Sequence, residues 1–160
     1  MNQHLLPQPK VLSPYAGSFT LGQDTPVVIP AQADAGVFFA AQQLGQEIDQ
    51  AICLDVPIVK TLAPPRRAIV LICGQEQAAA FDIEPERPQA PAHTADQAHS
   101  LSVTPDGIVL YADAPGGLFY AVQTLRQLIR LHGAELPALT IHDWPTLPYR
   151  GLMLDVSRRK

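Results

Sequence analysis

The stretch ADAPGGLFYAVQTLRQL, residues 112–128, carries the clearest structural signal in this sequence. It begins at the end of an apolar run, passes through the glycine pair Gly116 and Gly117, and continues into a helical pattern. This pattern consists of apolar residues at the spacings that place them on one helix face: Leu118, Ala121, Val122, Leu125, Leu128 and Ile129. Gly133 is a signal for the end of the helix. Cationic side chains shortly before it interact favourably with the negative, C-terminal end of the helix dipole. We therefore predict a strand, a tight turn and an amphipathic helix that ends at Gly133.

A β-hairpin is predicted immediately before this helix. Residues 101–103 and 108–111 are apolar runs of strand type, and the turn TPDG, residues 104–107, lies between them. Proline, aspartate and glycine each favour a turn for a different reason, so this connection directly supports a hairpin. A further strand is expected after the helix, at residues 138–141.

The first half of the chain contains more strands and one long helix. Short strands are expected at residues 18–21, 26–29, 56–60 and 68–73. Asp34 is a suitable N-cap for an amphipathic helix of about 18 residues. The apolar stripe of that helix is formed by Val37, Ala41, Leu44, Ile48, Ala51 and Ile52. Residues 75–97 contain several prolines and acids, and we expect a surface excursion there rather than a regular element.

Several strands with two amphipathic helices indicate the α+β class. The hairpin favours a largely antiparallel or mixed β-sheet. The sheet is the only large partner that can cover both apolar stripes, so we expect both helices on one of its faces. Residues 144–151 are interpreted as a linker. Residues 152–158 begin apolar and end polar, a pattern typical of a buried parallel strand that opens onto a site.

Composition narrows the class of protein. The chain has 160 residues, of which 47% are hydrophobic and 16% charged, so it can build a core and is not intrinsically disordered. A net charge of −4 argues against a nucleic-acid partner. No apolar run is long enough to span a membrane, so no membrane partner is expected. Residues 1–9 lack the features of a signal peptide, which predicts a cytoplasmic protein as the sequence stands, or an exported one if the start is artificial.

The residues alone indicate no catalytic or metal-binding constellation. Five histidines lack metal-ligand spacing and are interpreted as surface or capping residues: His4, His93, His99, His132 and His142. The glycine pair lacks the fingerprint of a phosphate site. Cys53 and Cys73 are expected to be buried, inert thiols, and Asp82 and Glu84 to be solvated. We predict no catalytic residue and no metal site in this chain.

Residues 112–128 also resemble a known family. A small residue followed by Gly-Leu-Phe-Tyr-x-x-Gln-Thr-Leu-x-Gln-Leu is similar to the end of the N-terminal domain of glycoside hydrolase family 20, the β-N-acetylhexosaminidases. The segments IHDWP, residues 141–145, and PYRGLMLDVSR, residues 148–158, resemble that family's entry into its catalytic (β/α)₈ barrel. The opening LPQPK, residues 6–10, is similar to the family's usual start. The resemblance covers essentially the whole chain.

The resemblance implies a division at residue 143. Residues 1–143 would be the accessory α+β domain, and residues 144–160 the linker and first strand of a truncated barrel, because a complete barrel needs about 250 residues. The parent enzyme would hydrolyse terminal β-linked N-acetylhexosamine from glycans by substrate-assisted retaining catalysis, with no metal or organic cofactor. The adjacent Asp-Glu pair that the family uses occurs nowhere in this sequence. We therefore expect the isolated chain to be a non-catalytic domain.

Arg158 is the one substrate-binding residue that the resemblance implies. It matches the arginine with which the family holds hydroxyls of the terminal sugar, and a guanidinium can donate to two vicinal hydroxyls at once. Arg150, before the same strand, is interpreted as a stabilising residue. The catalytic barrel is the expected partner, and the lone strand at residues 149–156 is expected to cause weak self-association because its edges are unpaired. The alternative is a free-standing glycan-binding or protein-interaction module.

Overall fold

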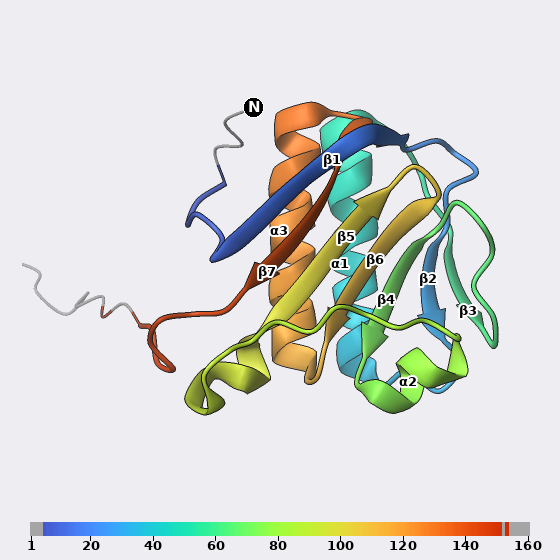
Figure 1. Ribbon diagram of the computed structural model, residues 1–160. Coiled ribbons are helices and arrows are strands. Elements are labelled where there is room, and N and C mark those ends of the chain that lie inside the picture. The colour runs from blue at the N-terminus through green and yellow to red at the C-terminus, as the bar shows by residue number, and fades with distance from the viewer. Residues whose placement is uncertain (1–4, 152, 154–160) are drawn as a thin grey trace, which may run out of the picture.

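The computed structural model describes residues 5–151 and residue 153. In chain order the elements are β1 (Val11–Thr20), β2 (Val27–Pro30), α1 (Ala35–Ile52), β3 (Ile58–Thr61), β4 (Ile69–Cys73), α2 (Gln75–Ala80), the 3-10 helix η1 (Ala92–Gln97), β5 (His99–Thr104), β6 (Gly107–Ala112), α3 (Pro115–His132) and β7 (Glu135–Asp143). The strands form a seven-stranded sheet, and Figure 1 shows α1 and α3 side by side on one of its faces. The predicted α+β class and the placement of both helices are confirmed.

The sheet is mixed, which is one of the two predicted arrangements. Its strand order is β1-β7-β5-β6-β4-β2-β3. Strands β1, β7, β5 and β6 pair antiparallel, and the predicted hairpin sets Val103 opposite Ile108. Strands β6, β4, β2 and β3 pair parallel. Parallel neighbours require a crossover connection, and α1 provides it between β2 and β3.

The main core lies between the sheet and the two long helices. Leu44 and Ile48 of α1 and Leu125 and Ile129 of α3 are at most 1% exposed, as both apolar stripes predict. They belong to one apolar cluster with inward-facing residues of the strands, such as Leu101. Full burial of one large apolar side chain contributes about 1.5–3 kcal/mol. This cluster therefore supplies most of the free energy that holds the helices on the sheet.

The prediction of an irregular excursion over residues 75–97 is partly wrong. Helices α2 and η1 lie within this segment, and Figure 1 shows it crossing the sheet face opposite α1 and α3. Ala78 and Phe81 pack there in a second apolar cluster with Val70 and Tyr111. Helices of one or two turns contain too few residues to show a helical period, so the sequence pattern did not reveal them. The acids Asp82 and Glu84 are exposed, as expected.

The predicted start of α1 and the predicted end of α3 are confirmed. Asp34 caps α1, because its Oδ1 atom accepts a hydrogen bond from the backbone N–H of Val37 at 2.9 Å. Helix α1 ends at Cys53, which has the left-handed backbone conformation often found at helix ends. Helix α3 has Pro115 in its first turn and ends at Gly133, whose φ is +67°.

The two glycines at the start of α3 have different surroundings. A Cβ atom on Gly117 would overlap the backbone oxygen of Ala98 and lie 2.9 Å from the Cβ atom of Ala112. A Cβ atom on Gly116 would meet nothing closer than the Asp96 backbone oxygen at 3.8 Å. Gly117 therefore allows α3 to approach the strands closely, whereas Gly116 has room for a Cβ atom at ordinary contact distance.

The ends of the chain differ from the sequence-based boundaries. Strand β1 begins at Val11 rather than at residue 18 and pairs with β7, with an irregularity between Pro14 and Ser18. Its length is set by this long-range pairing, which local propensity does not report. Residues 144–151 form no regular element, in agreement with a linker. The predicted barrel strand at residues 152–158 lies outside the described residues, apart from residue 153.

Candidate functional site

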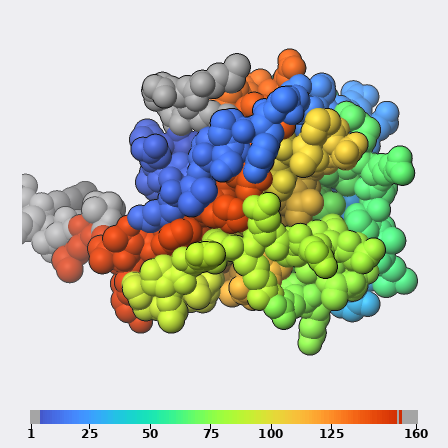
Figure 2. Space-filling view, in the orientation of Figure 1, coloured from blue at the N-terminus to red at the C-terminus, as the bar shows by residue number. Residues whose placement is uncertain are grey.

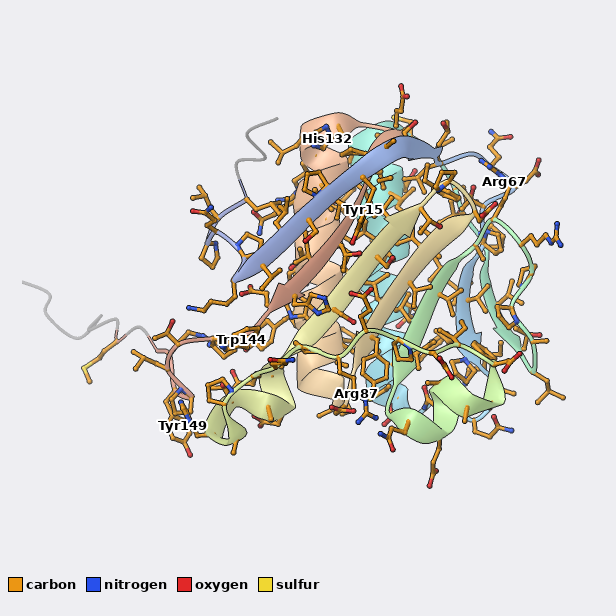
Figure 3. The ribbon with its side chains drawn as sticks, viewed as in Figure 1. Tyr15, Arg67, Arg87, His132, Trp144 and Tyr149 are labelled. Carbon is orange, nitrogen blue, oxygen red and sulfur yellow. The ribbon has the colours of Figure 1, made fainter. Side chains whose placement is uncertain are left out.

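A cleft of about 450 Å³ lies beside α3, at the end of β7. Its floor consists of side chains from β5 and α3, among them His99 and Gln123. Two segments form its walls: residues 7–10, before β1, and residues 144–150, after β7, which we call the linker. Figure 2 shows the linker passing between the N-terminal segment, in blue, and η1, in yellow-green, and Figure 3 places Trp144 at the end of β7.

The linker is held against the domain by Gln97 at the end of η1. The Nε2 atom of Gln97 donates to the backbone oxygen of Pro148 at 3.0 Å, and its Oε1 atom accepts from Nη2 of Arg150 at 2.9 Å. Arg150 also donates to the backbone oxygen of Leu147 at 3.2 Å, and its guanidinium lies 5.2 Å from the centre of the Tyr120 ring. These contacts are those of a stabilising residue, as interpreted for Arg150.

The N-terminal wall is held by α3 and by the linker. Gln127 makes two hydrogen bonds with the backbone of Leu6, accepting from its N–H at 2.9 Å and donating to its oxygen at 3.0 Å. Lys10 donates from Nζ to Oγ1 of Thr146 at 2.8 Å, and its backbone N–H donates to Oδ1 of Asp143 at 3.2 Å. Both walls therefore contact α3, the N-terminal wall through Gln127 and the linker through the Tyr120 ring. The two walls are also bonded to each other.

Asp143 has a half-buried side chain at the end of β7, directly before the linker. Burial raises its pKa above the ordinary value. The backbone N–H groups of Lys10 and Trp144 oppose this shift, as do the charges of Lys10 and Arg150. The site thus has an acceptor whose negative charge is only partly compensated.

His99 forms part of the floor and is only 3% exposed. Its Nε2 atom lies 3.0 Å from Oγ1 of Thr124. Burial lowers the pKa of His99 to about 4, and the nearby backbone of Gln97 acts in the opposite direction. The imidazole is therefore neutral at pH 7. The interpretation of His99 as a surface or capping residue is wrong, because α3 covers the side of β5 on which His99 lies.

A second polar cluster lies outside the cleft and joins the two long helices. Glu47 of α1 is 2% exposed and pairs with Arg126 and Arg130 of α3, with a 2.7 Å contact to a nitrogen of each guanidinium. Hydrogen bonding from Arg130, together with that from Arg126, holds the pKa of the Glu47 carboxyl below its ordinary value, although burial opposes the shift. A buried carboxylate with two cationic partners has no unpaired reactive group, so we assign this cluster a structural role.

The two cysteines have different surroundings. Cys53 is exposed at the end of α1, so the prediction that it is buried is wrong. Cys73 is half-buried at the end of β4, and burial raises its pKa to about 11, with the charges of Asp34 and Asp113 adding to the shift. A thiol with this pKa is protonated at neutral pH and is a poor nucleophile.

Other sequence predictions concern residues or features that the cleft does not include. Arg158, the implied substrate-binding residue, lies outside the described residues. Among residues 5–151 and 153, no three His, Cys, Asp or Glu side chains are placed to hold a metal ion. No helix within that part of the chain has both the length and the apolar content to cross a bilayer.

Sequence reasoning did not identify the residues that build the cleft. Gln97, Gln123 and Lys10 are ordinary polar residues, and no spacing relates them along the chain. Their only sequence signal was indirect, because Gln123 lies in the family-like stretch and Trp144 in the segment that follows β7. Folding brings them together from opposite ends of the chain.

The sequence and the fold are both similar to those of known glycosidases. A β-hexosaminidase of Vibrio vulnificus is 25% identical over 99% of this chain, which spans 16% of that protein. N,N'-diacetylchitobiase of Vibrio harveyi is 45% identical over 38% of this chain and 7% of its own length. A solved chitobiase of Flavobacterium johnsoniae has the same fold over 94% of this chain and 22% of its own, with a TM-score of 0.66 and 21% identity.

This chain thus spans less than a quarter of the length of each of these relatives. Residues 2–144 match the family model described as glycosyl hydrolase family 20, domain 2. The match covers most of the chain and agrees with the resemblance of residues 112–128. The chain therefore belongs to glycosyl hydrolase family 20, in which it corresponds to domain 2.

Proposed function

We propose that residues 1–143 form the non-catalytic accessory domain of a β-N-acetylhexosaminidase, and that residues 144–160 lead into its catalytic (β/α)₈ barrel. In this role the domain holds the barrel in a defined position and does not itself cleave the glycan. The family assignment supports this function, since domain 2 of family 20 accompanies a catalytic barrel. The parent enzyme would remove terminal β-linked N-acetylhexosamine by substrate-assisted retaining catalysis.

The observation that carries the proposal is the attachment of the linker to the domain. Domains joined by a loose tether move relative to each other unless contacts restrain them. Here Lys10 binds Thr146, Gln97 binds Pro148, and Arg150 binds Gln97 in return. Thr146, Pro148 and Arg150 of the linker are therefore each fixed to the domain.

A partly exposed aromatic patch adjoins the linker and supports the same function. Phe39, which is 51% exposed, stacks on Phe119 with ring centres 6.1 Å apart, and Phe119 meets Tyr120 edge to face at 6.2 Å. Tyr120 in turn contacts Arg150 of the linker. Because the patch continues from the linker, we assign it as the surface against which the barrel packs. In the alternative function, a free-standing interaction module, the same patch would bind a separate partner.

Arg158 would contribute to the active site from the start of the barrel. We propose that its guanidinium donates to two hydroxyls of the terminal sugar, because barrel sites are built at the carboxyl ends of the strands and the planar fork suits vicinal oxygens. In an enzyme that carries this chain before a family 20 barrel, Arg158→Lys should raise KM for a chromogenic β-N-acetylglucosaminide. An unchanged KM would contradict this role.

The positioning role is tested in the same enzyme. Gln97→Ala removes both hydrogen bonds that hold the linker, each of which contributes about 0.5–1.5 kcal/mol. We expect a lower thermal midpoint and a lower kcat/KM, because the barrel loses its fixed orientation. Gln50→Ala, at an exposed position of α1, is the matched control and should change neither.

Two results would contradict the proposed function. One is equal activity and stability of the Gln97→Ala and Gln50→Ala enzymes. The other is hydrolysis of the chromogenic substrate by residues 1–160 alone, at a specific activity that stays constant through purification. We expect no such hydrolysis, because the chain contains no Asp-Glu pair.

A further inference from the structure

We propose that a small pocket on the sheet face opposite α1 and α3 binds the ammonium head of a lysine side chain from a partner protein. The pocket has a volume of about 180 Å³. Side chains of β5, β6 and β7 form its floor, and residues 83–86, which follow α2, form its wall. It shares no lining residue with the cleft, so this proposal does not depend on the function proposed above.

The strand register places three hydroxyls together on one face of the sheet. Ser102 of β5 is paired with Thr140 of β7 on one side and with Val109 of β6 on the other. Ser100 lies two positions before Ser102 on β5. Leu101, between the two serines, belongs to the main core under the helices. Because side chains alternate along a strand, the hydroxyls of Ser100, Ser102 and Thr140, which we call the hydroxyl floor, face away from the helices.

The hydroxyl floor is buried but has no hydrogen-bond partner among the described residues. Ser100 is 5% exposed and Thr140 is 6% exposed. The hydroxyls of Ser18 and Thr104, by contrast, donate to protein oxygens. Fully enclosed side-chain atoms without a partner occur elsewhere in the described chain but not in the floor, so its oxygens keep surface that a ligand can touch. Buried polar groups are nearly always paired, so these hydroxyls require partners from outside the chain.

The wall makes the pocket electronegative. Glu84 and Glu86 line it. Glu86 lies 3.2 Å from Nε2 of His142, whereas Glu84 has no ion pair within the described residues. Arg87, the next residue, is directed instead to Asp113 at 3.8 Å, and none of the described residues that line the pocket is cationic. The carboxylates disfavour an anion, and they favour a cation over water because hydrogen bonds between charged groups are the stronger ones.

The groups in the pocket favour an ammonium among the cations. A primary ammonium has three N–H donors and no acceptor, so it can donate to separate hydroxyl and carboxylate oxygens. A guanidinium is a planar fork that suits one carboxylate, and it fits a floor of single hydroxyls less well. Ca²⁺ takes about 6–8 oxygen ligands, and no three acidic, histidine or cysteine side chains are placed to hold a metal ion in the described part of the chain.

The size of the pocket indicates that only the head of the ligand enters it. A volume of about 180 Å³ is below the roughly 300–1,000 Å³ that is usual for sites that enclose a whole small molecule. A lysine side chain carries its ammonium on a flexible apolar stem. Ile83 and Val109, which line the pocket and pack against the second apolar cluster, offer apolar surface to that stem. The rest of the partner protein stays outside the pocket.

The test is a titration of ¹⁵N-labelled residues 1–160 with the capped peptide Ac-Gly-Lys-Gly-NH₂, followed by amide chemical shifts. We expect shifts at Ser100, Ser102 and Thr140 that saturate in the millimolar range, as is usual for a single charged group. The same peptide with an Nε-acetylated lysine has no charge and should bind at least about tenfold more weakly. The corresponding arginine peptide should also bind more weakly than the lysine peptide.

Two variants with matched controls locate the contacts. Thr140→Val removes one floor hydroxyl and keeps the shape of the side chain, and it should weaken lysine-peptide binding about tenfold. Thr20→Val, at an exposed position of β1, should bind like the unchanged chain. Glu84→Gln removes a carboxylate of the wall and should weaken binding and reduce its dependence on salt, whereas Glu76→Gln, at an exposed position of α2, should change neither. The amide spectrum of each variant verifies that the fold is retained.

Four outcomes would overturn the proposal. They are the absence of saturable shifts, shifts that lie away from the hydroxyl floor, equal affinity for the acetylated or the arginine peptide, and equal affinity of the folded Thr140→Val and Thr20→Val chains. The titration uses neither the barrel nor the linker variants. Its failure would therefore leave the proposed function untouched, and a failed linker experiment would not change the titration.

Discussion

The glycine pair at the start of α3 allows a prediction in which neighbouring substitutions have opposite effects. Replacing a helical glycine by alanine normally stabilises a protein by about 0.4–1 kcal/mol, because the unfolded chain loses freedom. At Gly116 a new Cβ has room, so we expect this gain. At Gly117 the new Cβ overlaps the backbone oxygen of Ala98 and lies 2.9 Å from the Cβ of Ala112.

The cost at Gly117 can be compared with the gain. Overpacking a tight site costs about 1–3 kcal/mol. The upper part of that range applies here, because the obstacle is a backbone carbonyl in the connection to β5 and cannot rotate away. After subtracting the helix gain, Gly117→Ala should destabilise the chain by about 2 kcal/mol, and the two variants should differ by roughly 3 kcal/mol.

The measurement is urea denaturation of the unchanged chain, Gly116→Ala and Gly117→Ala, followed by circular dichroism. We expect the midpoint to rise slightly for the first variant and to fall clearly for the second, with similar slopes for all three. The reasoning is refuted if Gly117→Ala is as stable as Gly116→Ala, since α3 would then not depend on close contact with the strand connection.

Three further predictions concern the core, a buried histidine and the C-terminal segment. Leu125→Ala should lower the free energy of unfolding by roughly 2–5 kcal/mol, because Leu125 is fully buried; an unchanged denaturation midpoint would count against the packing. The unfolded chain protonates His99 near pH 6.5, whereas the folded chain does so only near pH 4. Stability should therefore fall as the pH drops from 6.5 towards 4, and denaturation curves of His99→Gln should lack this part of the slope. Deletion of residues 149–160 should abolish the weak self-association expected of the full chain, and light scattering that shows a strictly monomeric full chain would disprove it.

Local signals account for the parts of the fold that could be predicted. The cap at Asp34, the stop at Gly133 and the turn at residues 104–107 each act through neighbouring residues, so the long helices and the hairpin agree with the structure. The apolar stripes identified Leu44 and Leu125 as core residues for the same reason. Helices α2 and η1 were missed because each is only six residues long.

The candidate site was much less accessible to sequence reasoning. His99 was interpreted as a surface or capping residue because it lacks metal-ligand spacing and precedes the strand predicted at residues 101–103. The sequence did not show that β5 begins at His99 or that α3 covers it. Gln97 lies in a segment that was expected to be irregular, and its partners Pro148 and Arg150 follow 51 and 53 positions later. Hydrogen bonds over such distances depend on the folded arrangement and have no periodic signature.

By itself, the sequence of this protein determined its class, its two long helices, its hairpin and, through residues 112–128 and 141–158, its resemblance to family 20. These properties are encoded within short stretches, where each side chain acts on its own turn, cap or helix face. Only the tertiary structure decided the mixed strand order, the burial of His99 and the cleft between residues 7–10, α3 and the linker. The cleft arises where segments more than one hundred positions apart pair through β1 and β7. The strand order and the burial of His99 likewise depend on contacts between separate elements, which form only when the whole sheet assembles.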